Sequence, residues 1–268
     1  MKRRLKKIVI ALAVFYPFIV GGMFLIQEKL IFLPSELPLD HEYSFDIPFE
    51  ELWLTHPDGA QLNALHFKSE NPKGIVLYFH GNSGDLDRWG SIAGSFTKFN
   101  YDVLVMDYRT YGKSSGNLGE KPMYEDAALF YKKAAELFPE DQIIVYGRSL
   151  GTTFATFVAS ENKPGKLLLE TPFYSLSSLV KDRYWFVPVN TLLRYKFPTN
   201  KYILEVNCPI VIFHGTEDGI VPYKHGVQLH ETLPKSQSKL LTIEGGSHNN
   251  LIDFEIYRAA IQHEMTQP

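Results

Sequence analysis

A series of short apolar runs, repeated along most of the sequence, constrains the fold of this chain more than any other feature. After Pro34 these runs alternate with longer amphipathic stretches. Parallel strands need crossover connections of a dozen or more residues, usually helices, so the alternation predicts a mostly parallel sheet covered by helices. The expected strands are residues 51–55, 62–67, 75–79, 103–106, 142–146, 167–169, 210–213 and 239–243.

The connections between these runs predict helices and one exception. The turn signal Pro57-Asp58-Gly59 joins the first two strands as a hairpin. Helices are expected at about 85–99, 123–138, 151–160 and 226–232. Segment 172–200 departs from the alternation, because it is rich in aromatic residues and leucine and is interrupted by Pro188 and Pro198. Two interpretations stay open for it: a cap inserted over the C-terminal edge of the sheet, and an ordinary crossover helix with irregular flanks.

The N-terminal segment has the pattern of a membrane anchor. Residues 8–26 contain no charged side chain, and as a helix they would be about 28 Å long at ~1.5 Å per residue. The basic cluster before them predicts a cytoplasmic N-terminus, with the rest of the chain on the far side, periplasmic, extracellular or lumenal. A cleaved signal peptide is the alternative, although the run is long for one and lacks a small-residue cleavage pattern. A buried core helix is disfavoured by the basic flank, which comprises Lys2, Arg3, Arg4, Lys6 and Lys7.

Overall composition excludes several classes of function. A formal net charge of −3 gives no reason to expect a nucleic-acid partner. The single cysteine, Cys208, excludes an internal disulfide, and the apolar run after it predicts a buried thiol. No cluster of cysteine and histidine has the spacing of a zinc site, so we expect no metal.

The pentapeptide Gly147-Arg148-Ser149-Leu150-Gly151 is the first sign of chemistry. A G-x-S-x-G sequence arises often by chance, but this one follows an expected strand and precedes an expected helix. That is the setting of a nucleophile elbow, in which a strained turn presents the serine and glycines allow close backbone approach. The helix N-terminus then favours negative charge that develops at the reacting oxygen. Ser149 is therefore the predicted nucleophile.

A serine hydroxyl needs a base, and the base needs an acid to orient it. Asp218 follows the strand at 210–213 and His248 follows the last strand, so both are expected at the same sheet edge as Ser149. We predict His248 as the base and Asp218 as the acid. Two other acidic residues, Glu217 and Glu170, are weaker candidates for the acid.

Several other polar residues receive structural interpretations. His225 and His230 fall in a predicted helix and are expected at the surface. Asp107 is expected to stabilise a turn, and His80 to bond its own loop. Arg148 is either a solvated charge or the partner of an acid near the elbow.

The oxyanion hole is expected to consist of backbone amides. One is the amide of Leu150, which follows the nucleophile. The second comes from the loop after strand 75–79, where Asn82 is the best candidate.

Taken together, the chain resembles the α/β-hydrolase superfamily, and within it the membrane-anchored Bem46-like and ABHD13-like serine hydrolases. The resemblance covers the chain from about Leu52 onward, and the N-terminal anchor fits it too. It implies an α/β-hydrolase fold, the triad Ser149, Asp218 and His248, and the Asn82 and Leu150 amides as oxyanion hole. One departure is Thr110, where such proteins commonly have glycine. The matching segments are 78–82, 107–114, 147–151, 170–173, 214–218 and 246–248.

The expected organisation is a basic tip, transmembrane anchor and interfacial segment over 1–33, followed by a hydrolase domain over 34–268. The expected reaction is hydrolysis of a carboxylic ester or thioester through an acyl-enzyme on Ser149, without a cofactor. The partners are a small-molecule or lipid acyl ester and, through the anchor, a membrane. Open alternatives are a membrane-anchored peptidase or amidase with the same triad, acyl transfer to an acceptor other than water, and a non-catalytic binding domain. A dehalogenase is disfavoured, because it would need aspartate at position 149.

Overall fold

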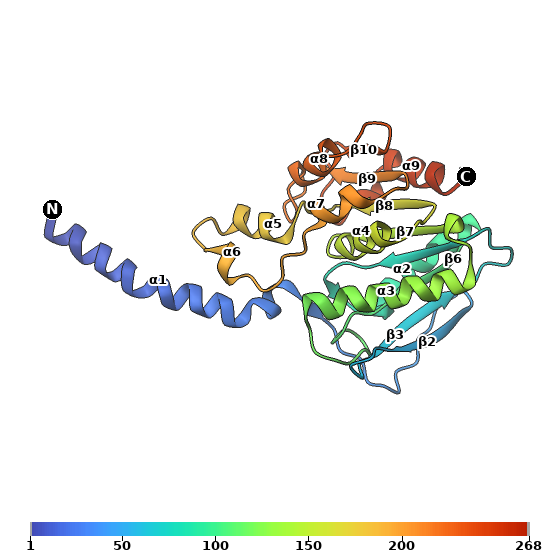
Figure 1. Cartoon of the computed structure of the whole chain (residues 1–268), viewed down its shortest axis with the longest axis horizontal. Helices are drawn as coiled ribbons and strands as arrows, with labels where there is room; N and C mark the ends of the chain where they lie inside the picture. The colour runs from blue at the N-terminus through green and yellow to red at the C-terminus, as the bar shows by residue number, and fades with distance from the viewer. Residues whose placement is uncertain (1, 267–268) are drawn as a thin grey trace.

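An eight-stranded sheet forms the centre of the molecule (Figure 1). The computed structural model describes residues 2–266, apart from the side chains of residues 8, 9, 11 and 12. The strand order is β10-β9-β8-β7-β4-β6-β3-β2, with β2 and β3 antiparallel to their neighbours and all other pairs parallel. The predicted strands and the opening hairpin are therefore confirmed. Their bounds are β2 Phe49–Thr55, β3 Gln61–Phe67, β4 Ile75–Phe79, β6 Asp102–Met106, β7 Ile143–Arg148, β8 Lys166–Glu170, β9 Ile210–Gly215 and β10 Ser238–Ile243.

Helices cover both faces of this sheet, as an α/β-hydrolase fold requires. Successive residues of a strand point to opposite faces, so the central strands feed two separate hydrophobic cores. One core holds Leu77 and Leu104 and is covered by α3, α4 and α8; the other holds Val76 and Val103 and is covered by α2 and α9. The helix bounds are α2 Leu86–Gly94, α3 Glu120–Leu137, α4 Gly151–Glu161, α8 Lys224–Glu231 and α9 Glu255–Thr266.

The predicted helices are confirmed in type, with differences at their ends. The helix expected over 85–99 is capped by Asp85, whose carboxylate accepts from the Asp87 amide, and it ends at Gly94. The chain continues as the 3₁₀ helix η1, Ser95–Phe99, which ends at Asn100 with φ 60°. Helix α3 begins a turn earlier than expected, and α9 was not expected. The remaining 3₁₀ helices are η2 Glu140–Gln142, η3 Ile203–Glu205 and η4 Leu251–Asp253.

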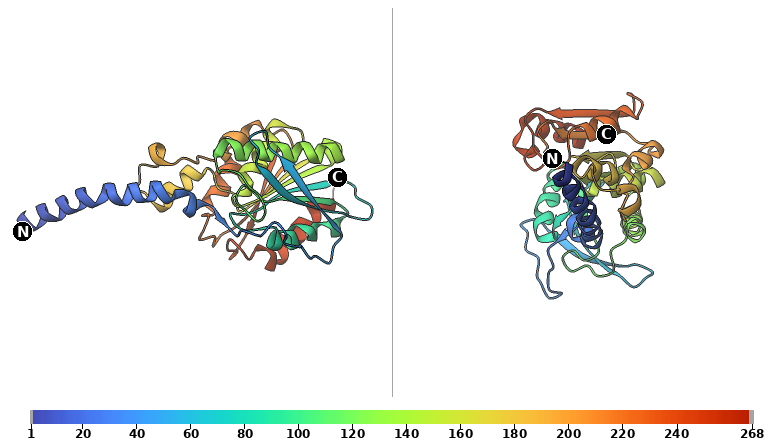
Figure 2. Two further views of the ribbon diagram at one scale, coloured as in Figure 1. Left: turned by 90° about the horizontal axis from the view of Figure 1, so that it is seen from below. Right: turned by 90° about the vertical axis from the view of Figure 1, so that its left-hand side faces the viewer.

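The N-terminal segment is a single long helix, α1, Lys2–Ile31, that projects from the body of the molecule (Figures 1 and 2). Its stretch Ala13–Ile31 is long and apolar enough to cross a membrane, and only 11% of that stretch is buried. After α1, the short strand β1, Leu33–Pro34, pairs with β5, Ser83–Gly84. The anchor candidate is therefore joined directly to the loop that follows β4.

Segment 172–200 leaves the C-terminal edge of the sheet and extends beside the C-terminal half of α1 (Figures 1 and 2). It contains two short helices instead of one crossover helix. They are α5, Leu176–Arg183, and α6, Val189–Leu192, and a third short helix, α7 Thr199–Tyr202, returns the chain to the sheet.

Cys208 is buried, as the sequence predicts, with 7% of its surface exposed. Burial raises the pKa of its thiol to about 12. The thiol is therefore protonated and unreactive at neutral pH.

Candidate active site

Ser149 lies in the tight turn between β7 and α4, where the sequence predicts an elbow. Its φ of 51° is in the left-handed region, an unfavourable conformation for a residue with a side chain. The neighbouring glycines are required by close packing. A Cβ on Gly151 would lie 2.0 Å from the Phe79 carbonyl oxygen, and one on Gly147 would lie 2.7 Å from the Gly151 carbonyl oxygen. The strand-turn-helix context of the motif is confirmed.

The structure brings the three predicted side chains together from three strand ends. The Ser149 hydroxyl lies 3.0 Å from Nε2 of His248, and Nδ1 of His248 lies 2.7 Å from the Asp218 carboxylate. Each of the three residues is less than 10% exposed. A proton on Nδ1 donated to the carboxylate leaves the Nε2 lone pair facing the serine hydroxyl. Such an arrangement can withdraw a proton from Ser149 as its oxygen attacks a carbonyl carbon.

Asp218 is held as a carboxylate by its surroundings. Burial alone raises its pKa, but hydrogen bonds from His214 and His248 outweigh burial and hold the pKa well below its usual range. The backbone N–H groups of Ile220 and Val221 also donate to Oδ1, at 2.9 and 2.8 Å. A permanently ionised Asp218 can fix the His248 tautomer and stabilise the imidazolium that forms when His248 takes a proton.

The two rival acids lie elsewhere. Glu217 is exposed on the loop before Asp218. Glu170 lies 3.2 Å from Arg148 Nε and accepts hydrogen bonds from Tyr146 and Tyr257. The pairing of Arg148 with an acid near the elbow is therefore the correct one of its two interpretations. Arg148 Nη2 also donates to the His248 carbonyl at 3.4 Å, so this ion pair supports the loop that carries the predicted base.

The surface placement predicted for His225 is wrong. The residue has no exposed surface, because α8 packs under the start of segment 172–200. Its Nε2 lies 3.0 Å from the Asp182 carboxylate on α5, and its Nδ1 accepts from the Tyr174 amide at 3.2 Å. His225 thus ties α8 to the segment beside α1. His230 is half-buried and bonds to Ser238, so it too is held by a partner.

A second buried histidine-aspartate pair lies beneath the β4 loop. Nδ1 of His80 donates to the Gly81 carbonyl at 2.6 Å, which agrees with the loop-bonding role predicted for it. Its Nε2 lies 3.3 Å from Asp107, whose other carboxylate oxygen accepts from the Leu86 amide at 3.2 Å. Both side chains have no exposed surface. Asp107 therefore bonds a backbone amide, as predicted, but this amide is at the start of α2 and not in the turn that follows Asp107.

Thr110 lies in the loop after Asp107 and has a φ of 71°. This left-handed conformation favours glycine, which accounts physically for the glycine expected there from the resemblance. Its side-chain hydroxyl is buried without a partner in the described residues. The departure affects the loop and leaves the three hydrogen-bonded side chains untouched.

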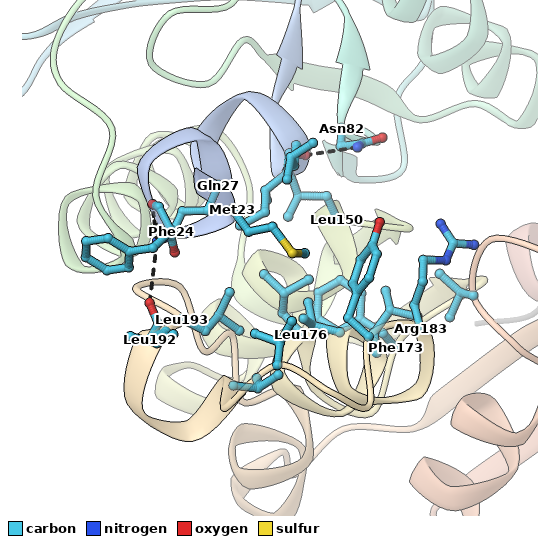
Figure 3. Close-up of a pocket in the computed structure, with 18 of the residues that line it drawn as sticks. Met23, Phe24, Gln27, Asn82, Leu150, Phe173, Leu176, Arg183, Leu192 and Leu193 are labelled. Carbon is cyan, nitrogen blue, oxygen red and sulfur yellow. Dashed lines mark hydrogen bonds between the residues drawn. The ribbon is translucent and has the colours of Figure 1, made fainter. Parts of the chain in front are cut away.

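A cavity of about 230 Å³ opens at Ser149 (Figure 3). Asn82 and Leu150, the residues predicted to supply the oxyanion hole, both line it. Neither of their amides donates to any turn, loop or cap hydrogen bond within residues 2–266. The Asn82 side chain is engaged elsewhere, because Nδ2 donates to the Ile31 carbonyl at the end of α1, at 3.0 Å.

Sequence reasoning missed that α1 forms one wall of this cavity. The lining residues on α1 are Val20, Met23, Phe24, Gln27, Leu30 and Ile31, which recur with the spacing of one helix face. The sequence does not identify this face, because α1 is apolar on every side and no face stands out. The only signal is Gln27, the single side chain with a hydrogen-bonding amide within the apolar stretch.

Several known proteins are similar to this chain in sequence or in fold. The family model described as serine aminopeptidase, S33, matches residues 70–203, which is half of the chain. The chain is 26% identical to the lysophosphatidylserine lipase ABHD12 of Danio rerio, with 88% of this chain and 74% of that protein covered. It is 29% identical to an uncharacterized membrane protein of Saccharomyces cerevisiae, with 80% of this chain and 78% of that protein covered. The structure of the Pyrococcus furiosus esterase Pf2001 superposes with a TM-score of 0.67 at 18% identity, covering 86% of this chain and 97% of that one.

The solved structure, at 18% identity, shows the fold alone, whereas the family model covers half of the chain and shows the family to which it belongs. The protein is a hydrolase of the α/β-hydrolase fold, and its apolar helix together with the membrane-protein relative indicates membrane association. The chain belongs to the α/β-hydrolase family described as serine aminopeptidase, S33.

Proposed function

We propose that the protein is a serine hydrolase that cleaves carboxylic ester or thioester bonds through an acyl-enzyme on Ser149. The observation that carries the proposal is the hydrogen-bond chain from Ser149 through His248 to Asp218, at 3.0 and 2.7 Å, at the base of an apolar cavity. Each distance is within the range that proton transfer between positioned groups requires.

The proposed reaction has two halves. Ser149 Oγ attacks the carbonyl carbon while His248 Nε2 takes the hydroxyl proton, and the same proton passes to the leaving alkoxide or thiolate as its bond to carbon breaks. Water then attacks the acyl-serine, His248 takes a proton from the water, and that proton returns to Ser149 Oγ as the carboxylic acid leaves. Asp218 stays ionised throughout and stabilises the imidazolium.

The oxyanion of each tetrahedral intermediate would be bound by the Leu150 and Asn82 amides. Leu150 is the N-cap residue of α4, so the partial positive charge at that helix end adds to the amide dipole. The Asn82 backbone is fixed from both sides, because its carbonyl accepts from the Leu33 amide and the Tyr111 hydroxyl.

For the organisation of the chain we propose an uncleaved single-pass anchor over 1–33 and a hydrolase domain over 34–268, with 172–200 as a cap. The basic residues in the first turns of α1 favour a cytoplasmic N-terminus, with the hydrolase domain on the far side of the membrane. The apolar cavity, the anchor and the similarity to a lysophosphatidylserine lipase favour a lipophilic acyl substrate.

A peptidase or amidase is the second candidate, because the matching family is described as serine aminopeptidase. The same three side chains could cleave an amide. A panel of aminoacyl amides and acyl esters, compared by kcat/KM, separates the two. We expect the esters to be preferred, since the cavity wall is mainly apolar.

The direct test is hydrolysis of a butyryl ester by the full-length protein in detergent, with Ser149→Ala compared with Ser160→Ala. Ser160 lies at the other end of α4, where its hydroxyl bonds the Phe157 carbonyl, so it serves as a matched serine. Ser149→Ala is expected to lose nearly all activity and Ser160→Ala to keep it. Equal activity in Ser149→Ala and the wild type would overturn the proposal.

A further inference from the structure

The C-terminal turns of α1 carry a face that is turned toward Ser149. Val20 is 7% exposed and Gln27 is 6% exposed, although neighbouring residues on other faces are open: Leu25 is 74% exposed and Phe18 75%. Met23 points into the space between α1 and segment 172–200, toward Leu176 and Leu150 (Figure 3). The helix is therefore part of the cavity wall and does more than tether the domain.

Polar contacts fix this part of α1 against segment 172–200. Gln27 Oε1 accepts from the Arg194 amide at 2.8 Å, and its Nε2 donates to the Leu192 carbonyl at 3.4 Å. Glu28 accepts from the Tyr195 hydroxyl at 2.7 Å. The Arg194 guanidinium also stacks 4.6 Å from the Phe24 ring. These contacts form one band near residues 27 and 28, at which the two walls of the cavity are joined.

The depth of the cavity relative to a bilayer follows from helix length. Twenty helical residues counted from position 8, where the basic cluster ends, reach Gln27 and cover about 30 Å at about 1.5 Å per residue. The alternative apolar window, Ala13–Ile31, extends further still. With the boundary at Gln27, Val20 and Met23 lie within the hydrocarbon, in the leaflet nearest the hydrolase domain, and the polar band lies at the surface of that leaflet. With the boundary at Ile31, both residues still lie within the hydrocarbon, near its centre.

The segment opposite α1 suits the same depth. Residues 184–193 contain no charged side chain, whereas Arg183 and Arg194 flank them. The tip of this stretch contacts α1 about three helical turns N-terminal to the polar band. There the Tyr16 hydroxyl donates to the Phe186 carbonyl at 2.7 Å. Trp185, at that tip, is 86% exposed, and such an exposed large aromatic side chain favours contact with a membrane.

We propose that α1 and residues 184–193 form an acyl-binding slot whose mouth lies within the bilayer, and that the substrate is a membrane-resident ester of a long acyl chain. The chain enters sideways from the leaflet, its carbonyl reaches Ser149, and its hydrocarbon lies between Met23 on α1 and Val187 on the opposite wall. Met23 and Val187 are then specificity-determining residues. The assignment rests on the proposed function, because ester hydrolysis at Ser149 is its readout.

The first test compares butyryl and palmitoyl esters with the full-length protein in detergent. Met23→Trp fills the slot from α1 and Val187→Trp fills it from the other wall. Each is expected to lower the ratio of kcat/KM for the palmitoyl ester to kcat/KM for the butyryl ester by about tenfold or more. Leu25→Trp, on the lipid-facing side of α1, is the matched control and is expected to treat both esters as the wild type does.

The outcomes separate the two proposals. Retained butyryl hydrolysis shows that a variant is folded, so a selective loss of palmitoyl hydrolysis supports the slot. Unchanged chain-length preference in both Met23→Trp and Val187→Trp overturns the slot alone. Hydrolysis that persists in Ser149→Ala, or an absence of hydrolysis in the wild type, overturns the proposed function and the slot with it.

The second test measures the depth of the slot without activity. Full-length protein is reconstituted into phosphatidylcholine vesicles with or without brominated acyl chains, which quench tryptophan fluorescence on contact. Wild-type protein is expected to lose more fluorescence than Trp185→Phe, since Trp53 is on the far edge strand β2 and Trp89 is buried. Equal quenching of the two proteins would place the tip outside the bilayer and overturn entry from the leaflet.

Discussion

The molecule contains a buried histidine-aspartate pair after strands β9 and β10, Asp218 with His248, and another after β4 and β6, His80 with Asp107. The two pairs differ in what surrounds the carboxylate. Asp218 accepts two backbone N–H groups and lies 2.7 Å from His248. Asp107 accepts one backbone N–H group, at 3.2 Å, and lies 3.3 Å from His80. Only His248 has its second nitrogen beside a serine hydroxyl. His80 has Tyr108 and Trp89 packed around its ring instead.

The difference shows in the direction of the two pKa shifts. Hydrogen bonds outweigh burial at Asp218 and hold its pKa below 3.8, whereas burial dominates at Asp107 and raises its pKa above 3.8. A carboxylate that stays ionised can stabilise an imidazolium, and one that tends toward the neutral form cannot do so as well. A buried histidine-aspartate pair is therefore not by itself a catalytic pair; donors to the carboxylate and access to a nucleophile are also needed.

The largest expected contrast is between the two histidines. His248→Gln removes the base and is expected to lower kcat for a butyryl ester on the order of 10⁵-fold. His80→Gln removes a loop hydrogen bond and is expected to change kcat by less than about tenfold while it lowers stability by about 1 to 3 kcal/mol. Initial rates and urea unfolding measure both quantities. A loss of similar size in both variants would remove the distinction between the pairs.

The aspartates should show the same contrast, at a smaller scale. Asp218→Asn keeps an acceptor for the Ile220 and Val221 amides but no longer fixes the His248 tautomer, so kcat is expected to fall about 10⁴-fold. Asp107→Asn is expected to keep kcat within about tenfold of the wild type, because no reacting atom lies near it. Saturation kinetics on the butyryl ester measure both. An Asp107→Asn variant as inactive as Asp218→Asn would show that the second pair takes part in the chemistry.

The smallest expected effect is on stability as a function of pH. The lowered pKa of Asp218 stabilises the fold above pH 3.8, and this contribution is lost as the pH falls below 3.8 through the lowered pKa. The raised pKa of Asp107 acts in the opposite sense, because its buried charge becomes more costly as the pH rises from 3.8 through the raised value.

Urea unfolding of the two asparagine variants between about pH 3 and pH 7 measures these opposite dependences of the unfolding free energy on pH. Asp218→Asn should be most destabilising, relative to the wild type, at neutral pH and least so in acid. Asp107→Asn should become relatively more stable as the pH rises. Parallel curves for the two variants would contradict the assigned ionisation states.

The sequence predicts that the three side chains come together, because each part of the prediction is local. Ser149, Asp218 and His248 each lie in the loop or turn that follows a strand, and the parallel sheet brings those strand ends to one edge without further information. The same argument offers an acidic partner for Arg148 only as an alternative and does not identify Glu170, since a pairing across β7 and β8 depends on register. Side-chain ionisation at Asp107 and Asp218 is not readable at all, because it depends on which backbone amides the loops present.

Two features depend on packing between distant segments and could not be predicted from the sequence: the burial of His225 and the protein-facing side of α1. His225 lies on an amphipathic helix, and nothing local says that segment 172–200 will cover it. The inward face of α1 is hidden because an apolar helix is apolar on every side, so periodicity identifies neither its lipid face nor its protein face. Gln27 is the one position at which a polar residue marks the contact.

The central claim is that Ser149 is the nucleophile and that His248 activates it. Peptide mass mapping of the full-length protein after reaction with a fluorophosphonate tests this most directly. We expect one adduct, on the peptide that contains Ser149, and expect its rate of formation to fall to background in His248→Gln. An adduct on another residue, or labelling of Ser149 that is as fast in His248→Gln as in the wild type, would contradict the claim.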